Sequence, residues 1–279
     1  MARPFAHLSD EEWLEMLRRS VTEEIVEGVK FPRFPDTGIQ STIVGSANEH
    51  ALQEAYLFYC FVKSKSASIG APVAPESTVL DFGCGWGRFL RFFWKDVDAT
   101  NLYGVDVDPG VIDLCLQTGV PGTLRVLESY DRLPFRDAFF SHVMAYSVFT
   151  HLPEKVHLHW MKEIARVTKP GASFCLTLEP RRFLDFVSRL NERTAETGWE
   201  QRMSRFAGLA SSSKQAFDSG EFVYLPTGGG KYHPSDVYGE AIVPLHYVEQ
   251  NWKEFFRIVE YVDDPTRFPQ AALAVQRFS

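Results

Sequence analysis

The sequence predicts an α/β protein built on a mainly parallel sheet, and three observations support this. Short apolar strands alternate with helices from residue 79 onward, which is typical of crossover connections between parallel strands. The first of these strands runs directly into a glycine cluster and a helix. Two apolar runs near the end of the chain, separated by a polar turn, predict a final hairpin. A hydrophobic fraction of 45% over 279 residues is enough to bury a sizeable core.

The pattern of apolar runs places the individual elements. The expected strands cover residues 78–82, 101–108, 123–128, 141–147 and 172–179. Helices are expected from the glycine cluster to about residue 95, from Pro109 onward, and from Pro153 to about residue 169, because proline is favoured in the first turn of a helix. The runs 255–262 and 271–278 are expected to pair as the final hairpin.

Two further segments differ from this alternation. Residues 1–74 predict an N-terminal helical extension, in which Ser9 with Glu12 and Ser46 with Glu49 have the spacing of capping boxes. The second domain covers 75–279. Within it, residues 180–250 are polar, contain runs of serine and glycine, and show no clean period, so we interpret them as an insertion after the fifth strand. Such an insertion is expected to act as a lid that selects a substrate.

Composition excludes several classes of protein. The four cysteines are widely spaced without a C-x-x-C pair, so neither a disulfide framework nor a metal site is expected. The N-terminus lacks an apolar signal segment, and no apolar run approaches 18 residues, which predicts a cytoplasmic protein without a membrane span. A net charge of −7 argues against a nucleic-acid partner.

The glycine cluster is the most informative motif. Gly83, Gly85 and Gly87 follow the first strand directly, where glycines allow a sharp turn and the close approach of a ligand to the backbone. Asp106 ends the second strand, where an acid can accept hydrogen bonds from both ribose hydroxyls of a nucleotide. Arg88 stands where the nicotinamide fingerprint needs its third glycine. A nicotinamide-dependent oxidoreductase is therefore the less favoured alternative.

The order of motifs resembles one family. VLDFGCGWGRFL, YGVDVDP, LPFRDAFF, AYSVFTHLPE and RVTKPGASFCLTLE stand in the order found in class I S-adenosylmethionine-dependent methyltransferases, in the bacterial small-molecule branch with SVFTHL after the fourth strand. The resemblance is strong over about 75–180 and weaker over 245–279. It implies a Rossmann-like, seven-stranded, mostly parallel sheet with an antiparallel last strand, and S-adenosyl-L-methionine as cofactor.

The resemblance also implies roles for residues. Asp81, Gly83 and Gly85 would line the methionine part of the cofactor, and Tyr146 would lie near it through its backbone. Asp106 would bind the ribose. The expected adenine contacts are these: Val107, Ser129 and Tyr130. Ser129 stands where the family usually has an acid, and Glu128 or Asp131 in a shifted register is the alternative.

Methyl transfer to a hydroxyl group is helped by a general base, and histidine suits that role because its pKa lies near neutrality. His151 follows the fourth strand and is the candidate, with a structural role in the loop as its alternative. His157 is expected to be solvated and His142 to be a satisfied sheet residue. Trp86 and Phe149 have two interpretations, an aromatic wall for the cationic donor or ordinary core packing.

The acceptor is expected to be a small molecule, such as a sugar or a secondary metabolite, methylated on oxygen or nitrogen. The motifs of amino-DNA, cytosine C5 and protein arginine methyltransferases are absent from the sequence. A module that binds the cofactor without turnover is the alternative. The aromatic N-terminal helices fit either part of the acceptor pocket or the contact of a homo-oligomer.

Overall fold

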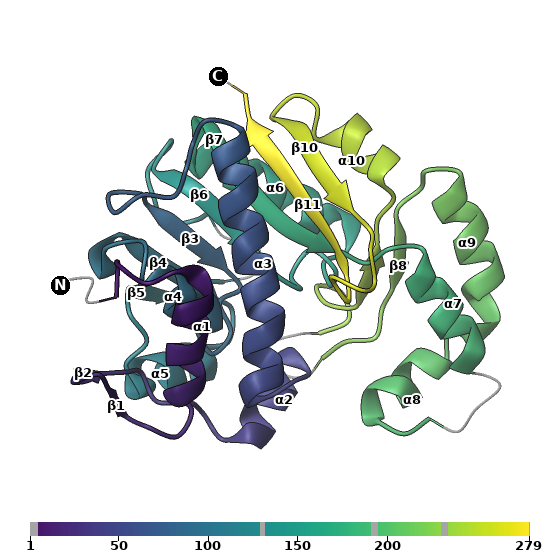
Figure 1. Cartoon of the computed structure of the whole chain (residues 1–279). Helices are drawn as coiled ribbons and strands as arrows, with labels where there is room; N and C mark the ends of the chain where they lie inside the picture. The colour runs from purple at the N-terminus through teal and green to yellow at the C-terminus, as the bar shows by residue number, and fades with distance from the viewer. Residues whose placement is uncertain (1–4, 129–131, 191–194, 230–233, 279) are drawn as a thin grey trace. The chain divides into compact units, whose positions relative to one another are not determined.

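The computed structural model describes residues 5–128, 132–190, 195–229 and 234–278 (Figure 1). In these residues the α-helices are α1 (Asp10–Arg19), α2 (Thr37–Val44), α3 (Asn48–Ser68), α4 (Arg88–Phe93), α5 (Pro109–Thr118), α6 (Glu154–Val167), α7 (Arg182–Arg189), α8 (Gly198–Ser204), α9 (Ala210–Asp218) and α10 (Leu245–Asn251). The strands are β1 (Ile25–Val26), β2 (Val29–Lys30), β3 (Val79–Phe82), β4 (Leu102–Asp106), β5 (Thr123–Val126), β6 (Phe140–Ala145), β7 (Thr168–Leu178), β8 (Val223–Leu225), β9 (Glu240–Ile242), β10 (Phe256–Val262) and β11 (Ala271–Arg277).

Seven of these strands form one mostly parallel sheet in the order β10-β11-β7-β6-β3-β4-β5. Strand β3 pairs in parallel with both β4 and β6, and β4 pairs in parallel with β5. The predicted final hairpin is confirmed, because β10 and β11 pair antiparallel with Phe256 opposite Arg277. The predicted fold class, a Rossmann-like sheet with an antiparallel last strand, is therefore confirmed. The strand order reverses between β3 and β6, and ligands of such sheets bind at a reversal of this kind.

The chain divides into two compact units. The first consists of residues 1–145 and 166–175, and it contains the N-terminal helices together with β3, β4, β5 and β6. The second consists of 146–165 and 176–278, and it contains α7 to α10 with strands β8 to β11. The predicted division into 1–74, 75–279 and the insertion 180–250 stays a prediction.

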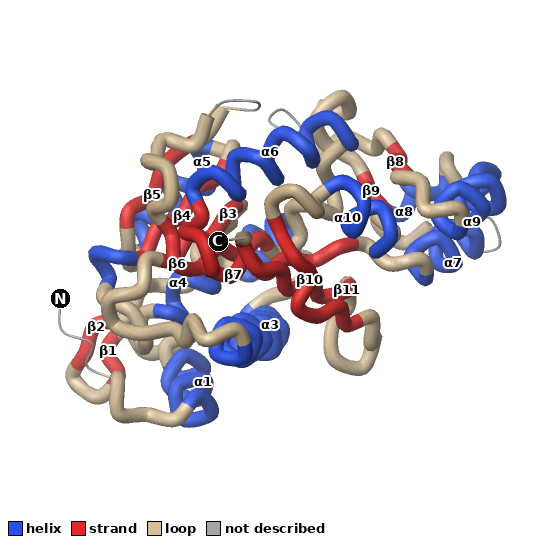
Figure 2. Tube along the Cα trace, turned by 90° about the horizontal axis from the view of Figure 1, so that it is seen from above, coloured by secondary structure: helices blue, strands red, loops and turns tan. Residues whose placement is uncertain are grey.

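Helix α1 is anchored to the first unit by one apolar face and one cluster of charges. Its N-terminus has the predicted capping box, in which the Ser9 hydroxyl accepts from the backbone of Glu12 and the Glu12 carboxylate accepts from that of Ser9. The indole of Trp13, fully buried, donates to the carbonyl of Phe92 in α4 at 3.0 Å. Asp10 accepts from Lys95 at 2.7 Å. Figure 2 shows α1 and α3 on the same side of the strands, as their packing requires.

The second predicted capping box is wrong. Helix α3 has Ala47 at its N-cap, without a side-chain cap. Ser46 lies one residue too early, and its hydroxyl donates instead to Glu54 at 2.8 Å, one turn further into the helix. The spacing of Ser46 and Glu49 therefore does not mark an N-terminal cap.

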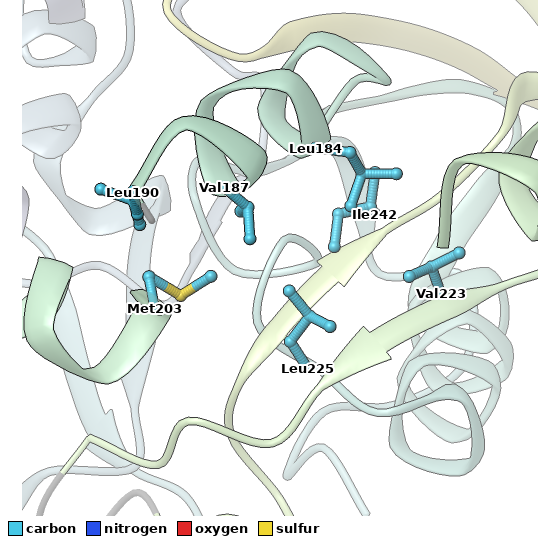
Figure 3. Packing of buried hydrophobic residues seen from close by; sticks show 7 residues of the cluster. All are labelled: Leu184, Val187, Leu190, Met203, Val223, Leu225 and Ile242. Atoms are coloured by element: carbon cyan, nitrogen blue, oxygen red, sulfur yellow. The ribbon is translucent and has the colours of Figure 1, made fainter. Parts of the chain in front are cut away.

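The segment that follows β7 contains more regular structure than its polar sequence indicated. Helices α7, α8 and α9 pack on the antiparallel pair β8–β9 around a core of their own, shown in Figure 3: Leu184, Val187, Leu190, Met203, Val223, Leu225 and Ile242. Leu184 and Val187 lie three residues apart in α7, and Leu190 follows at the same interval as the C-cap of the helix, so the three share one face. This part of the chain is therefore a small packed layer and not a long loop.

Neither unit contains a disulfide cross-link between described residues. All four cysteines are free thiols. Among the described residues, no group of three or more histidine, cysteine or acidic side chains is arranged to hold a metal ion. Nor does any helix there have the length and hydropathy needed to cross a membrane.

Candidate functional site

The glycine loop (residues 83–87) joins β3 to α4 in the first unit. Gly83, Gly85 and Gly87 all have positive φ, at 78°, 51° and 79°, a conformation that side chains other than glycine rarely adopt. A Cβ on Gly87 would lie 2.5 Å from a methyl group of Val120. The backbone conformation therefore favours glycine at all three positions, and at Gly87 the lack of space requires it as well.

Asp106 at the end of β4 is oriented by backbone donors. Its Oδ2 accepts from the Gly85 N–H at 3.0 Å, and its Oδ1 accepts from the Asp108 N–H at 3.1 Å. The carbonyl of Gly85 is also engaged, by the thiol of Cys115 at 3.1 Å. The carboxylate and the glycine loop are therefore one connected element, as a site for a ribose next to a glycine loop needs. Val107 follows, half-buried.

Asp81, near the end of β3, is the unusual group of the first unit. Its carboxyl is 1% exposed, and neither oxygen has a hydrogen-bond partner among the described residues. Burial raises its pKa to about 8, Arg88 opposes the rise, and Asp106 adds to it. A buried carboxyl without donors costs free energy. This carboxyl therefore fits a ligand that brings donors or positive charge, which the methionine ammonium group of the predicted cofactor does.

Two aromatic candidates belong to the core. Trp86 is fully buried, 5.5 Å from the ring of Phe34 and 5.3 Å from the guanidinium of Arg91. Phe149 is fully buried as well, 5.7 Å from the ring of Trp252. Of the two interpretations of these residues, core packing is the one that the structure supports.

The structure describes only some of the other predicted residues. Ser129 and Tyr130, the expected adenine contacts, lie outside the described residues, as does Asp131. Glu128, the alternative acid, is exposed. Tyr146 is half-buried and begins the second unit, directly after β6.

His151 lies in the second unit, at the centre of a polar group that we call the His151 cluster: Ser147, His151, Glu179, Glu240 and Gln270. The Nδ1 of His151 is 2.8 Å from the carbonyl of Gly239 and 3.4 Å from the Glu240 carboxylate. Its Nε2 is 3.4 Å from the hydroxyl of Ser147. Since a carbonyl only accepts, Nδ1 carries a proton, and in the neutral ring Nε2 is left as the acceptor.

The electrostatics of the cluster favour a basic imidazole. Burial alone would lower the pKa of His151, but the hydrogen bond and the charge of Glu240 outweigh it, so its pKa is raised above the usual value. Glu179, also buried, has its pKa raised to about 7 by burial and by Glu240. The second unit therefore buries two carboxyl groups beside one histidine, and the pKa values of Glu179 and His151 are both shifted upward.

Gln270 connects the two ends of the cluster. Its amide nitrogen donates to the Ser147 hydroxyl at 2.9 Å and to Glu179 at 3.0 Å, and its oxygen accepts from Thr177 at 2.6 Å. Ser147 itself has a positive φ of 57°, which is strained for serine. Backbone strain kept at a polar cluster is typical of functional sites.

Sequence reasoning missed Glu179, Glu240 and Gln270. Glu179 and Gln270 lie 91 residues apart, and Glu240 lies in the segment that showed no clean period. The only local signal was Glu179 itself, an acid at the end of a strand that is otherwise apolar. The other two residues carry no motif, because only the tertiary fold brings them to His151.

Two other histidines, in strand β6 and helix α6, lie in different surroundings. His142 is a satisfied sheet residue as predicted, with Nδ1 3.0 Å from the Ser173 hydroxyl and Nε2 3.3 Å from that of Ser77. The prediction for His157 is wrong, because it is fully buried among aromatic rings, 4.8 Å from Phe149 and 5.4 Å from Trp252. Burial lowers its pKa to about 3, so its ring is neutral at physiological pH.

Parts of the chain are similar to known proteins. Residues 80–176 match a family model described as a methyltransferase domain. The 2-methyl-6-phytyl-1,4-hydroquinone methyltransferase of Synechocystis is 32% identical over 47% of this chain and 39% of its own length. Across this protein and two further curated methyltransferases, the chain matches between 39% and 57% of the relative's own length.

Solved structures share the fold. A S-adenosylmethionine-dependent methyltransferase from Clostridium acetobutylicum is 12% identical and covers 80% of this chain and 92% of its own, with a TM-score of 0.55. The magnesium protoporphyrin IX methyltransferase of Synechocystis, solved with bound SAH, is 15% identical and covers 86% of this chain and 93% of its own, with a TM-score of 0.50.

The family match and the solved structures point the same way. Residues 80–176 of the chain match the model of a methyltransferase domain, and the sheet has the fold of solved methyltransferases. The glycine loop and Asp106 lie within that matched segment, and so does His151.

Proposed function

We propose that this chain transfers a methyl group from S-adenosylmethionine to an oxygen or nitrogen atom of a small-molecule acceptor. The observation that carries the proposal is the buried carboxyl of Asp81, which has no hydrogen-bond partner among the described residues and lies one residue from the glycine loop. Most buried polar groups in folded proteins have a hydrogen-bond partner, and a bound ligand that donates to Asp81 would supply one. The methyltransferase domain over residues 80–176 indicates which ligand that is.

In this proposal the residues of the first unit hold the cofactor. Asp81, Gly83 and Gly85 contact its methionine part, Asp106 accepts from the ribose hydroxyls, and Val107 packs on the adenine. Two residues outside the described ranges, Ser129 and Tyr130, complete the adenine contacts, and Tyr146 contributes its backbone to the methionine part. The bound sulfonium supplies a methyl group that is already activated for in-line displacement.

His151 is the proposed catalytic residue of the second unit. Nε2 of His151 would take the proton of the acceptor oxygen or nitrogen, while the cofactor would supply the methyl group and keep the electron pair of the broken carbon–sulfur bond on its sulfur. That nitrogen is the acceptor of the neutral ring because the carbonyl of Gly239 engages Nδ1–H, and the Ser147 hydroxyl lies 3.4 Å from it. A pKa above the usual value makes this imidazole a stronger base than an isolated histidine.

A small molecule is the proposed acceptor for two reasons. The names of two similar proteins specify small acceptors, a hydroquinone and magnesium protoporphyrin IX. A net charge of −7 gives no general attraction to nucleic acid. Among small acceptors we propose a sugar or a secondary metabolite. We also place the reaction in the cytoplasm, because four free thiols suit a reducing compartment. The homo-oligomer contact of the N-terminal helices stays a prediction.

Calorimetry with S-adenosylmethionine tests the cofactor assignment. We expect binding by the wild-type chain, and affinity roughly ten- to 100-fold weaker in Asp106→Asn, because an amide cannot accept on both of its atoms. Asp113→Asn is the control, since that carboxylate is exposed on α5 of the same unit. Failure of the wild type to bind, or equal losses in the two variants, would contradict the assignment.

A panel of acceptors tests the reaction. The enzyme is mixed with the cofactor and with hydroquinones, sugars, porphyrin carboxylates or amines, and S-adenosylhomocysteine is measured by mass spectrometry. Formation that depends on one acceptor class supports the proposal. Tight cofactor binding without product across all classes would support instead the non-catalytic binding module.

A further inference from the structure

Three consecutive residues of the segment that follows β7 enclose the His151 ring. The ring of Tyr238 stacks on the imidazole, with centroids 4.5 Å apart and planes inclined by 17°. The carbonyl of Gly239 accepts from Nδ1–H, and the carboxylate of Glu240 lies 3.4 Å from the same atom. One short stretch of chain therefore sets both the plane and the orientation of the imidazole.

The backbone fixes the register of this stretch against the turn that carries His151. The Gly239 N–H donates to the His151 carbonyl at 2.9 Å, and the Ala241 N–H donates to the Thr150 carbonyl at 2.7 Å. These two backbone hydrogen bonds, on either side of Glu240, fix its position along the chain relative to the imidazole. Its second oxygen is held by the indole N–H of Trp199 in α8, at 2.8 Å.

The carboxylate of Glu240 has a high cost in this place. Glu240 is 2% exposed, and a buried carboxylate is unfavourable unless it is paired. A glutamine would satisfy Trp199 equally well at a lower cost. What a glutamine cannot supply is negative charge at Nδ1 of His151, which stabilises the protonated imidazole that forms when the ring accepts a proton.

We propose that Glu240 is the positioning residue of the reaction, the carboxylate that holds His151 in the orientation and charge state of a general base. The pairing follows a general logic, in which a base is oriented through its second nitrogen by a buried acid. The inferred role rests on the proposed function, because it assumes that His151 takes the acceptor proton. The coupling between the two side chains can be measured without turnover.

Other charged and polar groups around the ring are accounted for. The groups that face His151 or its partners lie on several elements. Ser147 follows β6, Glu179 follows β7, and Tyr238 and Gln270 precede β9 and β11. Arg182 in α7 and Arg202 in α8 are the nearby cations. Of these, only Glu179 carries acidic charge near the ring, and its raised pKa leaves it mainly protonated below pH 7. Glu240 is therefore the acid in direct reach of Nδ1.

The first test is a nuclear magnetic resonance titration of the His151 ring in the full chain. Removing the neighbouring charge in Glu240→Gln is expected to lower the pKa of His151 by about one unit or more. Glu249→Gln is the matched control, because Glu249 lies at the same 3.4 Å from an exposed histidine, His246. Glu240→Asp keeps the charge and is expected to retain most of the raised pKa.

The second test uses turnover. We expect Glu240→Gln to lose at least about tenfold in kcat at unchanged cofactor affinity, and the acidic limb of its pH–rate profile to move to lower pH. Glu240→Asp is expected to recover part of that rate. A purely structural role predicts neither the displaced limb nor the recovery.

Clear results would overturn the proposal. An unchanged His151 pKa in Glu240→Gln would remove the coupling, and full activity of that variant at every pH would remove the positioning role. If Glu240→Gln fails to fold, Trp199→Phe replaces it, because it releases the second oxygen of Glu240 while keeping an aromatic ring on Phe186. If the pKa of His151 and the turnover of Trp199→Phe both equal the wild-type values, the result would count against the proposal. If Glu240→Gln lowers the pKa of His151 but His151→Ala keeps the wild-type turnover, the proposed role of His151 as general base fails. The electrostatic coupling between Glu240 and His151 is then still supported.

Discussion

The glycine loop and the His151 cluster are built in opposite ways. The loop consists of five consecutive residues that form the site through their backbone, and the Gly85 N–H donates to Asp106 at the end of the next strand. The cluster uses side chains that span residues 147 to 270, held by hydrogen bonds between segments distant in sequence. A site made of backbone depends on the absence of side chains, whereas a site made of side chains depends on each partner being present.

This difference predicts opposite responses to mutation. Enlarging a residue is expected to damage the loop, and truncating a residue is expected to damage the cluster. The following experiments test that contrast, beginning with the largest expected effect.

His151→Ala is expected to reduce turnover by about 10²–10⁴-fold, because loss of a general base costs that much in other enzymes. Cofactor affinity should stay the same, since every proposed cofactor contact except Tyr146 belongs to the other unit or lies outside the described residues. Steady-state kinetics and calorimetry on one preparation separate the two effects. Unchanged turnover would assign His151 to the structure of the loop.

Gly87→Ala is expected to destabilise the first unit by about 2–4 kcal/mol, from the left-handed backbone and from overpacking against Val120. Gly45→Ala is the control, because Gly45 has the same φ of 79° with nothing within 4 Å of its Cβ position. Urea unfolding should show the smaller, purely conformational loss there. Adding Val120→Ala to Gly87→Ala should recover the steric part, and no recovery would locate the cost elsewhere.

Asp81→Asn tests the unpartnered carboxyl through pH. The pKa of Asp81 is near 8 when folded and 3.8 as a model value. Between these pH values the unfolded chain loses the proton while the folded chain keeps it, so wild-type stability falls as pH rises from about 4 to about 8. Asp81→Asn lacks this loss, and its Tm advantage should grow by at least about 3 °C across that range. If the Tm difference between Asp81→Asn and the wild type stays constant from pH 4 to pH 8, the pKa of Asp81 is not raised by folding. The variant should also bind the cofactor more weakly.

Ser147→Gly is expected to give the smallest effect, within about 1 kcal/mol, because relief of a positive φ offsets the loss of the Gln270 hydrogen bond. Ala138→Gly is the matched variant, since Ala138 has a φ of 50° and no side-chain hydrogen bond to lose. It should stabilise the protein, and the difference between the two variants measures what the Ser147 hydroxyl contributes. Equal stabilisation would mean that the hydroxyl contributes nothing.

The sequence predicted well whatever depends on neighbouring residues. The capping box at Ser9, the strands β3 to β7, the final hairpin and the glycine loop were all readable, because periodicity and capping are local. The box predicted at Ser46 failed because α3 has Ala47 at its N-cap, so Ser46 lies one residue too early for its hydroxyl to cap the first turn. His157 was misjudged because burial is set by Phe149 and Trp252, the latter 95 residues away, and not by the polar sequence around it.

By itself, the sequence determined the α/β fold, the glycine loop with Asp106 and the resemblance to a methyltransferase, because these lie in short contiguous motifs under backbone constraints. Only the tertiary structure decided that the 180–250 segment packs around its own core, and that Glu240 and Gln270 belong with His151. The physical reason is the distance along the sequence over which each property is determined. Backbone conformation is set within a few residues, whereas burial, side-chain hydrogen bonds and the pKa values that follow from them are set by whatever the fold brings into contact.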